Sequence, residues 1–248
     1  VDKESLSELS IMELLIDGVT NKHVLCGDTE NPCALSNWPM LSFNDSKEVI
    51  SIVWSYFDLR GSLDLKWIPC TLEKLLVTEN ALSGTVDLTS LPMTLVDFKL
   101  NKNALYGTVC LTCLPNSLKE LGLARNQLDG TLNLENLPNS LEQLFLNENR
   151  FFGEICLTKL PKSLYRLVFG QNQLSGRLDL RSLPEGLRYL YLFKNPFEGE
   201  TDFSQLPASL KHFYVSDTQL SGDLLVDNQR IYFTERSNIR LRHKSEEQ

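Results

Sequence analysis

The chain has 248 residues, of which 42% are hydrophobic and 23% are charged, a balance typical of a folded protein with a sizeable core. No segment approaches the roughly 18 consecutive apolar residues of a membrane-spanning helix, so we expect no membrane span. The formal net charge of −8, with both signs interspersed, argues against a nucleic-acid partner, because phosphate recognition needs clustered lysines and arginines.

Residues 1–44 are predicted to form an N-terminal helical cap. Apolar residues recur near helical spacing and Gly18 is a suitable stop, which predicts an amphipathic helix; these residues are Leu6, Leu9, Met12, Leu15, Ile16 and Val19. Such a helix would cover the first edge of a sheet that otherwise invites aggregation. Cys26 and Cys33 look like a pair, so we predict a local disulfide, with two free thiols as the alternative. A zinc site that includes His23 would lack a clear fourth ligand.

A repeat of 23 residues fills the middle of the chain. The dipeptide Leu-Pro recurs at this spacing from Leu91 to Leu206, and a glycine column and an asparagine column keep the same register. The glycines are Gly61, Gly84, Gly107, Gly130, Gly153, Gly176, Gly199 and Gly222, and the asparagines are Asn80, Asn103, Asn126, Asn149, Asn172 and Asn195. We therefore predict eight rungs, at residues 45–67, 68–90, 91–113, 114–136, 137–159, 160–182, 183–205 and 206–228.

Each rung reads L-P-x-x-L-x-x-L-x-L-x-x-N-x-L-x-G-x-L-x-L-x-x, which resembles the leucine-rich repeat family with its hallmark L-x-x-L-x-L-x-x-N-x-L. The L-x-G-x-L tail is similar to plant-receptor-type repeats, and the opening Leu-Pro to bacterial-type repeats. The resemblance implies an α/β, β-rich solenoid, a curved right-handed stack of rungs with a parallel β ladder on its concave face. It also implies that partners bind on that face.

The columns of the repeat have physical reasons. The alternation Leu144-Phe145-Leu146 predicts a short parallel strand, and Leu132-Asn133-Leu134 predicts a second short ladder. Asparagine can satisfy backbone groups at the corner after the first strand, and glycine suits a corner that needs positive φ. At the far end, residues 229–248 are predicted to form a C-terminal cap, with a last strand at Ile231–Phe233 and a solvated charged tail from Arg240.

The remaining cysteines and acids suggest no metal or cofactor site. Cys110 and Cys156 occupy one column two rungs apart, about 10 Å, which is too far for a disulfide. Cys110 and Cys113 form a C-x-x-C motif at the end of the second ladder rather than at a helix N-terminus, which argues against a redox role. A column of acids that includes Asp179 is better explained as a salt-bridged surface than as a calcium site, which needs about six oxygens.

The outward residues of the first ladder define the candidate binding site. Aromatic residues, flanked by Arg166 and His212, gather in its C-terminal half, a composition typical of protein-binding hot spots. We predict partner contacts at Phe145, Arg166, Val168, Tyr189, Tyr191, Phe193, His212 and Tyr214. The alternative is that these aromatics only stabilise the ladder by cross-strand contacts.

No catalytic motif is present: the sequence has no G-x-S-x-G elbow, phosphate-binding glycine loop or H-E-x-x-H. We therefore expect a non-catalytic, monomeric module that binds a protein or peptide, the alternative being a structural or assembly subunit that uses its second ladder or caps. The first residues lack the basic and apolar segments of a signal peptide. The predicted cap disulfide and the sequon at Asn44 slightly favour a secreted or cell-surface location, whereas the unpaired cysteines favour the cytoplasm.

Overall fold

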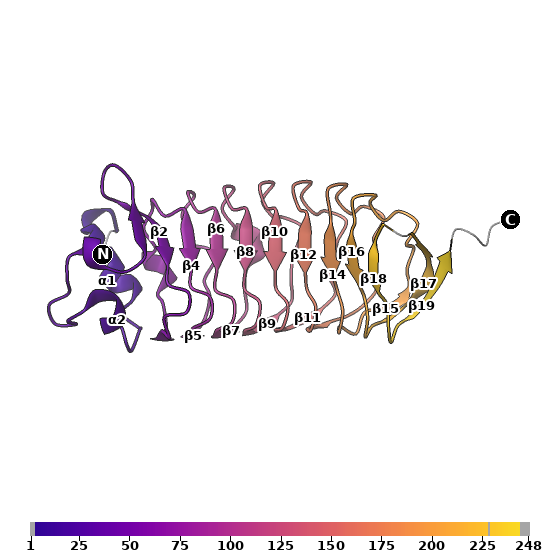
Figure 1. The fold of residues 1–248 in the computed structure, drawn as a ribbon, viewed down its shortest axis with the longest axis horizontal. Coiled ribbons are helices and arrows are strands. Elements are labelled where there is room, and N and C mark those ends of the chain that lie inside the picture. Colours follow the sequence, from indigo (N-terminus) through magenta and orange to yellow (C-terminus); the bar gives the residue numbers. More distant parts are fainter. Residues whose placement is uncertain (1–2, 228, 244–248) are drawn as a thin grey trace.

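The computed structural model describes residues 3–227 and 229–243, which form an elongated solenoid of stacked turns (Figure 1). The main sheet has ten strands, β1 Leu41–Phe43, β2 Val49–Val53, β4 Lys74–Leu76, β6 Asp97–Lys99, β8 Glu120–Gly122, β10 Gln143–Phe145, β12 Arg166–Val168, β14 Tyr189–Tyr191, β16 His212–Tyr214 and β18 Ile231–Phe233. Only β1 runs antiparallel to its neighbour. The predicted solenoid with a parallel ladder is therefore confirmed.

Strand register follows the repeat. Leu144 pairs with Leu121 on one side and with Leu167 on the other, one period of the sequence away in each direction. The eight predicted rungs supply β2 to β16, and the predicted strand Ile231–Phe233 adds a ninth parallel strand after a shorter step, with Phe233 opposite Tyr214. Because the inward side chains stack in register, each turn buries its leucines against the next.

A second ladder exists, but not at the predicted residues. Six short strands form one part of it, β3 Arg60–Gly61, β5 Ala81–Gly84, β7 Ala104–Gly107, β9 Gln127–Gly130, β11 Arg150–Gly153 and β13 Gln173–Leu174. Three strands form the other part, β15 Glu198–Glu200, β17 Gln219–Val226 and β19 Asn238–His243. The strand lies at residues 127–130, so the prediction of residues 132–134 is wrong. The side chain of Asn133 accepts a hydrogen bond from the N–H of Glu135 (3.0 Å), and this local turn competes with a ladder.

Two corners of every turn need positive φ. The column of glycines has φ between 81° and 133°, as predicted. The residue before each position of the asparagine column, including Phe57 and Thr218 in the terminal rungs, also has positive φ, between 51° and 65°, although none of these residues is glycine. They are Tyr56, Glu79, Lys102, Arg125, Glu148, Gln171, Lys194 and Asp217. The corner is tolerated because the ladders on both sides fix the backbone around it.

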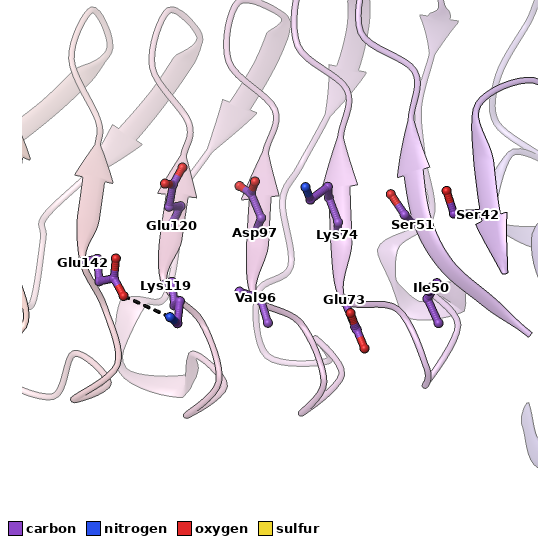
Figure 2. Close-up of a pocket in the computed structure, with 10 residues that line it drawn as sticks. All are labelled: Ser42, Ile50, Ser51, Glu73, Lys74, Val96, Asp97, Lys119, Glu120 and Glu142. Atoms are coloured by element: carbon purple, nitrogen blue, oxygen red, sulfur yellow. Dashed lines mark ion pairs between the residues drawn. The ribbon is translucent and has the colours of Figure 1, made fainter. Parts of the chain in front are cut away.

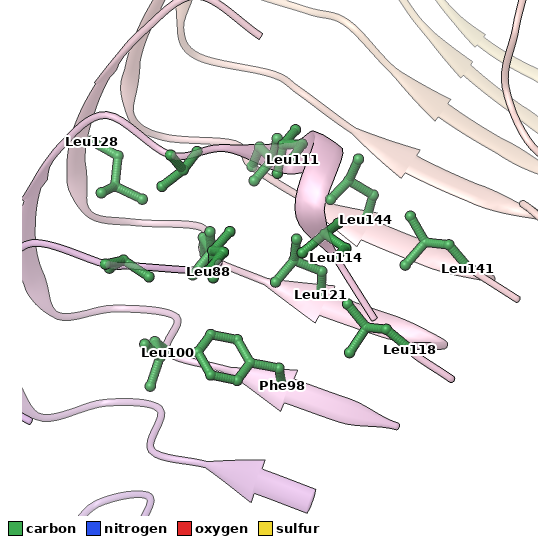
Figure 3. Packing of buried hydrophobic residues seen from close by; sticks show 14 of the residues in the cluster. Leu88, Phe98, Leu100, Leu111, Leu114, Leu118, Leu121, Leu128, Leu141 and Leu144 are labelled. Atoms are coloured by element: carbon green, nitrogen blue, oxygen red, sulfur yellow. The ribbon is translucent and has the colours of Figure 1, made fainter. Parts of the chain in front are cut away.

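The core is one continuous hydrophobic cluster that runs the length of the solenoid, and Figure 3 shows the part of it around Leu121. Leu121 and Leu144 are fully buried and Leu100 is 3% exposed. Phenylalanines replace leucines at some inward positions, and Phe98, Phe151, Phe169, Phe197 and Phe213 are among the largest fully buried side chains. Each buried side chain of this size contributes about 1.5–3 kcal/mol to folding, so the stack is held together mainly by its inward columns.

Two polar ladders satisfy the backbone at the turns. The side chain of Asn149 accepts a hydrogen bond from the N–H of Leu128 (3.0 Å) and donates to the carbonyls of Leu123 (2.9 Å) and Leu146 (3.1 Å), as its column was predicted to do. A hydroxyl ladder, which the sequence pattern did not reveal, joins successive rungs. Its members are Thr71, Thr94, Ser117, Ser140, Ser163 and Ser209, each of which donates to the carbonyl of a residue in the preceding rung.

The N-terminal cap contains the predicted helix, α1 Glu8–Leu15, together with α2 His23–Cys26 and the 3₁₀ turns Lys3–Ser5 and Leu35–Asn37. Ser7 caps α1, because its hydroxyl accepts a hydrogen bond from the N–H of Ser10 (3.1 Å). The cap lies close on the first rung: a Cβ at Gly61 would be 2.1 Å from the carbonyl oxygen of Gly18. Two further 3₁₀ turns, Leu65–Trp67 and Leu111–Cys113, lie within the repeats.

The C-terminal end differs from the prediction. Residues 240–243, predicted as the start of a charged tail, belong to β19, which pairs in parallel with β17. Leu241 lies opposite Leu224, so an alternation of apolar and charged residues forms this strand. The rest of the predicted tail, residues 244–248, lies outside the described residues. Within the described part of the chain, no helix is long and apolar enough to cross a membrane.

Candidate functional site

The outward residues of the main sheet form the predicted columns, and we call this surface the main-sheet face. Tyr191 lies opposite Val168 and Tyr214, while Tyr189 lies opposite Arg166 and His212. Each column therefore presents one side chain per turn, about 4.8 Å from the next. The face divides into an aromatic half over β10 to β18 and a charged half over β2 to β10.

Ring stacking organises the aromatic half. The rings of Tyr191 and Tyr214 are parallel, with an interplanar angle of 4° and 4.3 Å between centroids. Phe233 of the last strand meets Tyr214 edge-on at 4.4 Å. Such pairs contribute about 0.5–1.5 kcal/mol beyond the area they bury, so the row is held rigid before any partner arrives.

Arg166 continues the neighbouring column, which contains Tyr189 and His212. The guanidinium of Arg166 lies over the ring of Tyr189 at 4.1 Å and 5.9 Å from the ring of Phe145. On the other side of the same column, Tyr189 stacks on His212 at 4.9 Å. The Nε of Arg166 is buried without a hydrogen-bond partner, and among residues 3–227 and 229–243 no carboxylate lies within ion-pair distance of this guanidinium. Arg166 is thus a cation held among aromatic rings and free to pair with an incoming carboxylate.

The predicted contact residues are not equally accessible. Val168 is only 7% exposed, whereas Phe145, Tyr189, Tyr191, Phe193, His212 and Tyr214 are half-buried. Because the faces of the tyrosine rings are covered by stacking, a partner would contact the ring edges and the hydroxyl groups. Burial raises the pKa of Tyr191 above its ordinary value, and the neighbouring Tyr214 adds to the effect, so the hydroxyl stays a hydrogen-bond donor at neutral pH.

Phe193 depends on a small neighbour. A Cβ at Gly170 would lie 2.3 Å from Cε1 of Phe193, so the ring rests directly on the backbone of the preceding turn. Gly122 plays the same role for the side chain of Asn101, at 2.5 Å. These two glycines flatten the face where a larger side chain would protrude.

The charged half contains a hollow of about 460 Å³ that the sequence did not predict (Figure 2). It is lined by Ser42, Ile50, Ser51, Glu73, Lys74, Val96, Asp97, Lys119, Glu120 and Glu142. Figure 2 shows Lys119 and Glu142 joined across neighbouring strands, with 3.2 Å between Nζ and Oε1. With Lys99, which lies beside the hollow, four carboxylates face three ammonium groups, an excess of one negative charge.

Lys99 is the central cation of this half. Its ammonium contacts Asp97 at 3.2 Å and also pairs with Glu120. Burial raises the pKa of Asp97 above its ordinary value, and Lys99 only partly offsets this. Burial alone would lower the pKa of Lys99, but its hydrogen bonds and ion pairs with Glu120 and Asp97 outweigh burial and raise it. The strands therefore hold like charges close together and leave Asp97 incompletely neutralised.

Comparison with known proteins identifies the fold. No protein-family model and no curated protein matches the sequence. Among solved structures, the ectodomain of the Arabidopsis thaliana receptor kinase GASSHO1/SCHENGEN3, in complex with CASPARIAN STRIP INTEGRITY FACTOR 2, is similar over 94% of this chain and 36% of its own, with a TM-score of 0.55 and 18% identity. The chain has the leucine-rich repeat fold.

Two other structures are similar to this leucine-rich repeat chain. A plant ice-binding protein matches over 94% of both chains, with a TM-score of 0.52 and 19% identity. YopM from Yersinia enterocolitica matches over 71% of this chain and 43% of its own, with a TM-score of 0.50 and 24% identity. The chain thus spans less than half the length of the receptor ectodomain and of YopM, and at these identities the likeness concerns the fold.

The acidic column and the cap cysteines, which were also weighed as candidate sites, lie outside the main-sheet face. Among the described residues, no three His, Cys, Asp or Glu side chains come together as a metal site would require. The acidic column is a row of local turns, in which Asp179 pairs with Arg181 at 2.8 Å, and hydrogen bonds from Arg181 lower the pKa of Asp179 to about 2. Cys26 and Cys33 are free thiols here, joined through a backbone hydrogen bond of 3.0 Å from Cys33 N–H to the Cys26 carbonyl, and their disulfide stays a prediction.

Proposed function

We propose that this chain is a non-catalytic recognition module that binds a protein or peptide on its main-sheet face, the concave side expected for this fold. The observation that carries the proposal is the rigid aromatic row of Tyr189, Tyr191 and Tyr214 with the unpaired guanidinium of Arg166 at its edge. Tyrosine and arginine dominate binding hot spots, because they give a large contact area and directional hydrogen bonds at a low entropic cost. The similar receptor ectodomain in complex with its factor supports this use of the fold.

The two halves of the face favour different parts of a partner. The aromatic half suits apolar or aromatic side chains, and Arg166 suits a carboxylate. The excess negative charge around Asp97 and Glu120 suits a lysine or arginine. The same carboxylates disfavour nucleic acid, whose phosphates they would repel. We therefore infer a protein or peptide partner that has both a basic segment and an apolar one.

A peptide selection tests the proposal. Linear peptides selected from a random displayed library on the wild-type chain would be measured against the triple variant Tyr189→Ala, Tyr191→Ala, Tyr214→Ala. Truncating hot-spot residues costs about 1–2 kcal/mol or more each, so we expect at least a tenfold loss of affinity. The matched control is Tyr106→Ala with Phe152→Ala, two exposed aromatics on the second ladder (53% and 49% exposed). Equal binding to the wild type and the folded triple variant would refute the placement.

An assembly role is the second candidate, because apolar side chains are exposed at the C-terminal end of the stack. Leu225, Ile231 and Leu241 are 50%, 48% and 45% exposed, respectively. Contact between copies would bury these side chains, and the aromatic row would then only stiffen the sheet. Size measurement over a range of concentrations separates the two roles: we expect a monomer, whereas a concentration-dependent oligomer that Leu241→Asp abolishes would support assembly.

Although one similar structure is a plant ice-binding protein, we do not propose ice binding for this chain. A regular threonine column directly after the second-ladder strands, formed by Thr85, Thr108 and Thr131, stops after three turns. The next two positions in the column are Glu154 and Arg177, whose charges interrupt any regular hydroxyl array.

A further inference from the structure

A pair of exposed cysteines lies outside the main-sheet face and is independent of the function proposed above. Cys110 and Cys113 lie at the two ends of one short turn, and both side chains are exposed. Their Sγ atoms are 3.8 Å apart. The sequence placed this pair at the end of a ladder, but in the structure Cys110 is the N-terminal cap of the 3₁₀ turn Leu111–Cys113.

The turn explains why the two sulfurs meet. A 3₁₀ turn has three residues per turn and rises about 2 Å per residue, so side chains at i and i+3 are eclipsed and their Cα atoms lie about 6 Å apart. This separation falls inside the roughly 4.4–6.8 Å range of disulfides. Leu111 is 2% exposed and anchors the turn in the core, so the turn holds the two cysteines at this spacing.

The surroundings of Cys110 favour its thiolate. The hydroxyl of Thr112 lies 3.2 Å from Cys110 Sγ. Hydrogen bonds from the Thr112 side chain, its backbone N–H and Cys113 lower the pKa of Cys110 below its ordinary value. A larger thiolate fraction at neutral pH makes Cys110 the attacking group of the pair, with Cys113 in place to resolve a mixed disulfide.

We propose that Cys110 and Cys113 are a redox-active dithiol that closes to an internal disulfide by exchange with a low-molecular-weight disulfide such as oxidised glutathione. The Cys110 thiolate attacks one sulfur of the external disulfide, forms a mixed disulfide and releases one external thiolate, which takes up a proton. The Cys113 thiol then loses its proton, and the thiolate attacks Cys110 Sγ and displaces the second external thiolate. Two protein thiols are oxidised, and one external disulfide is reduced to two thiols.

The chain contains its own control for this site. Cys156 occupies the same column two turns further on and has the same neighbour, with the Thr158 hydroxyl 3.1 Å from its Sγ. The four residues from Cys156 read C-L-T-K, whereas the four from Cys110 read C-L-T-C. Cys156 has the same neighbouring hydroxyl but Lys159 in place of the resolving thiol, so it should stop at a mixed disulfide where Cys110 proceeds to an internal one.

Peptide mapping after oxidation tests the proposal. The full chain is reduced, exposed to oxidised glutathione at neutral pH, alkylated and digested with trypsin, which places both cysteines in one peptide, residues 103–119, and Cys156 alone in residues 151–159. We expect peptide 103–119 to lose both alkylation sites and two hydrogen atoms without gaining glutathione. Peptide 151–159 should carry either glutathione or the alkyl group.

A single variant distinguishes exchange from simple surface reactivity. In Cys113→Ser, the glutathione adduct on Cys110 should accumulate, and reducing agent should remove it. The proposal is overturned if wild-type peptide 103–119 carries glutathione on both cysteines, or if both remain alkylated while Cys156 is modified. Circular dichroism of the oxidised chain should be unchanged, because Cys110 and Cys113 lie outside both ladders.

Discussion

Replacing Asn126 by alanine should remove one link of the asparagine ladder and destabilise the whole stack. Its side chain accepts a hydrogen bond from the N–H of Leu105 (3.1 Å) and donates to the carbonyls of Leu100 and Leu123 (both 3.0 Å). The two carbonyls also accept from the asparagines of the neighbouring turns, at 3.1 Å and 2.9 Å, so each keeps one partner in the variant. The N–H of Leu105 loses the acceptor that the asparagine supplied.

The expected loss of stability follows from these hydrogen bonds. An unsatisfied buried N–H costs about 1–3 kcal/mol, and the two lost donations cost about 0.5–1.5 kcal/mol each before the second partners of the carbonyls compensate. We therefore expect Asn126→Ala to lower the free energy of unfolding by about 2–4 kcal/mol. Asn126→Thr should lose about 1 kcal/mol less, because the hydroxyl of Thr218 at the same column position donates to the carbonyl of Val215 at 2.7 Å.

Urea unfolding followed by circular dichroism measures the effect, with the change in midpoint converted at a common m-value. Asn139→Ala is the control, because Asn139 is an exposed loop residue and its replacement should stay within about 0.5 kcal/mol of the wild type. If Asn126→Ala is no more destabilising than Asn139→Ala, the ladder does not hold the turns together and the reasoning fails.

Three further predictions concern single residues. Gln171 has a φ of 59°, so Gln171→Gly should relieve about 1–2 kcal/mol of backbone strain, lose about 0.5–1 kcal/mol to chain entropy, and raise the urea midpoint. Arg181→Ala should raise the pKa of Asp179 from about 2 toward its ordinary value in a carboxylate NMR titration. The raised pKa of Asp97 means that its protonated form stabilises the fold below the unfolded-state pKa and that this stability is lost as pH rises. Asp97→Asn should therefore gain stability relative to the wild type between about pH 3 and 7, measured by urea midpoints, and a constant difference would contradict the pKa shift.

The main sheet could be predicted because two signals agree in the sequence. The alternation around Leu144 gives a strand with two inward residues, and the period of 23 residues places Leu121 and Leu167 beside it. The second ladder was misplaced because Leu132-Asn133-Leu134 alternates in the same way as a strand. Periodicity alone does not reveal that the side chain of Asn133 turns back to the N–H of Glu135.

Other features left weaker traces in the sequence. The corner with positive φ is occupied by Glu79, Lys102 or Gln171, none of which is typical of left-handed backbone, so only the neighbouring ladders impose it. The hydroxyl ladder was hidden because its column changes from threonine to serine after Thr94 and is broken at Gly186. Residues 240–243 of the last strand were interpreted as the start of a charged tail because Arg240, Arg242 and His243 are basic.

The candidate site was predictable as columns but not as a surface. A fixed register determines that Tyr189, Tyr191 and Tyr214 are neighbours, and the structure places them so. The hollow depends on where long charged side chains turn after the strand is formed. Lys99 bends to Asp97 and Glu120, and Lys119 reaches Glu142, so space opens between them. The partner of each lysine depends on the electrostatic interactions between individual side chains, which the spacing of residues in the sequence does not reveal.

The length of the face determines which peptides could use both of its halves. From Lys99 on β6 to Tyr191 on β14 a partner crosses four strand-to-strand steps, about 19 Å at 4.8 Å each. An extended peptide covers about 3.3 Å per residue, so roughly six residues are needed. Under the proposed function, shortening a selected peptide below this length should abolish the effect of either Lys99→Ala or Tyr191→Ala on its affinity, while longer peptides should respond to both. Affinities that respond to both variants at every length would show that the two halves do not act as separate subsites, because a short extended chain cannot reach from one to the other.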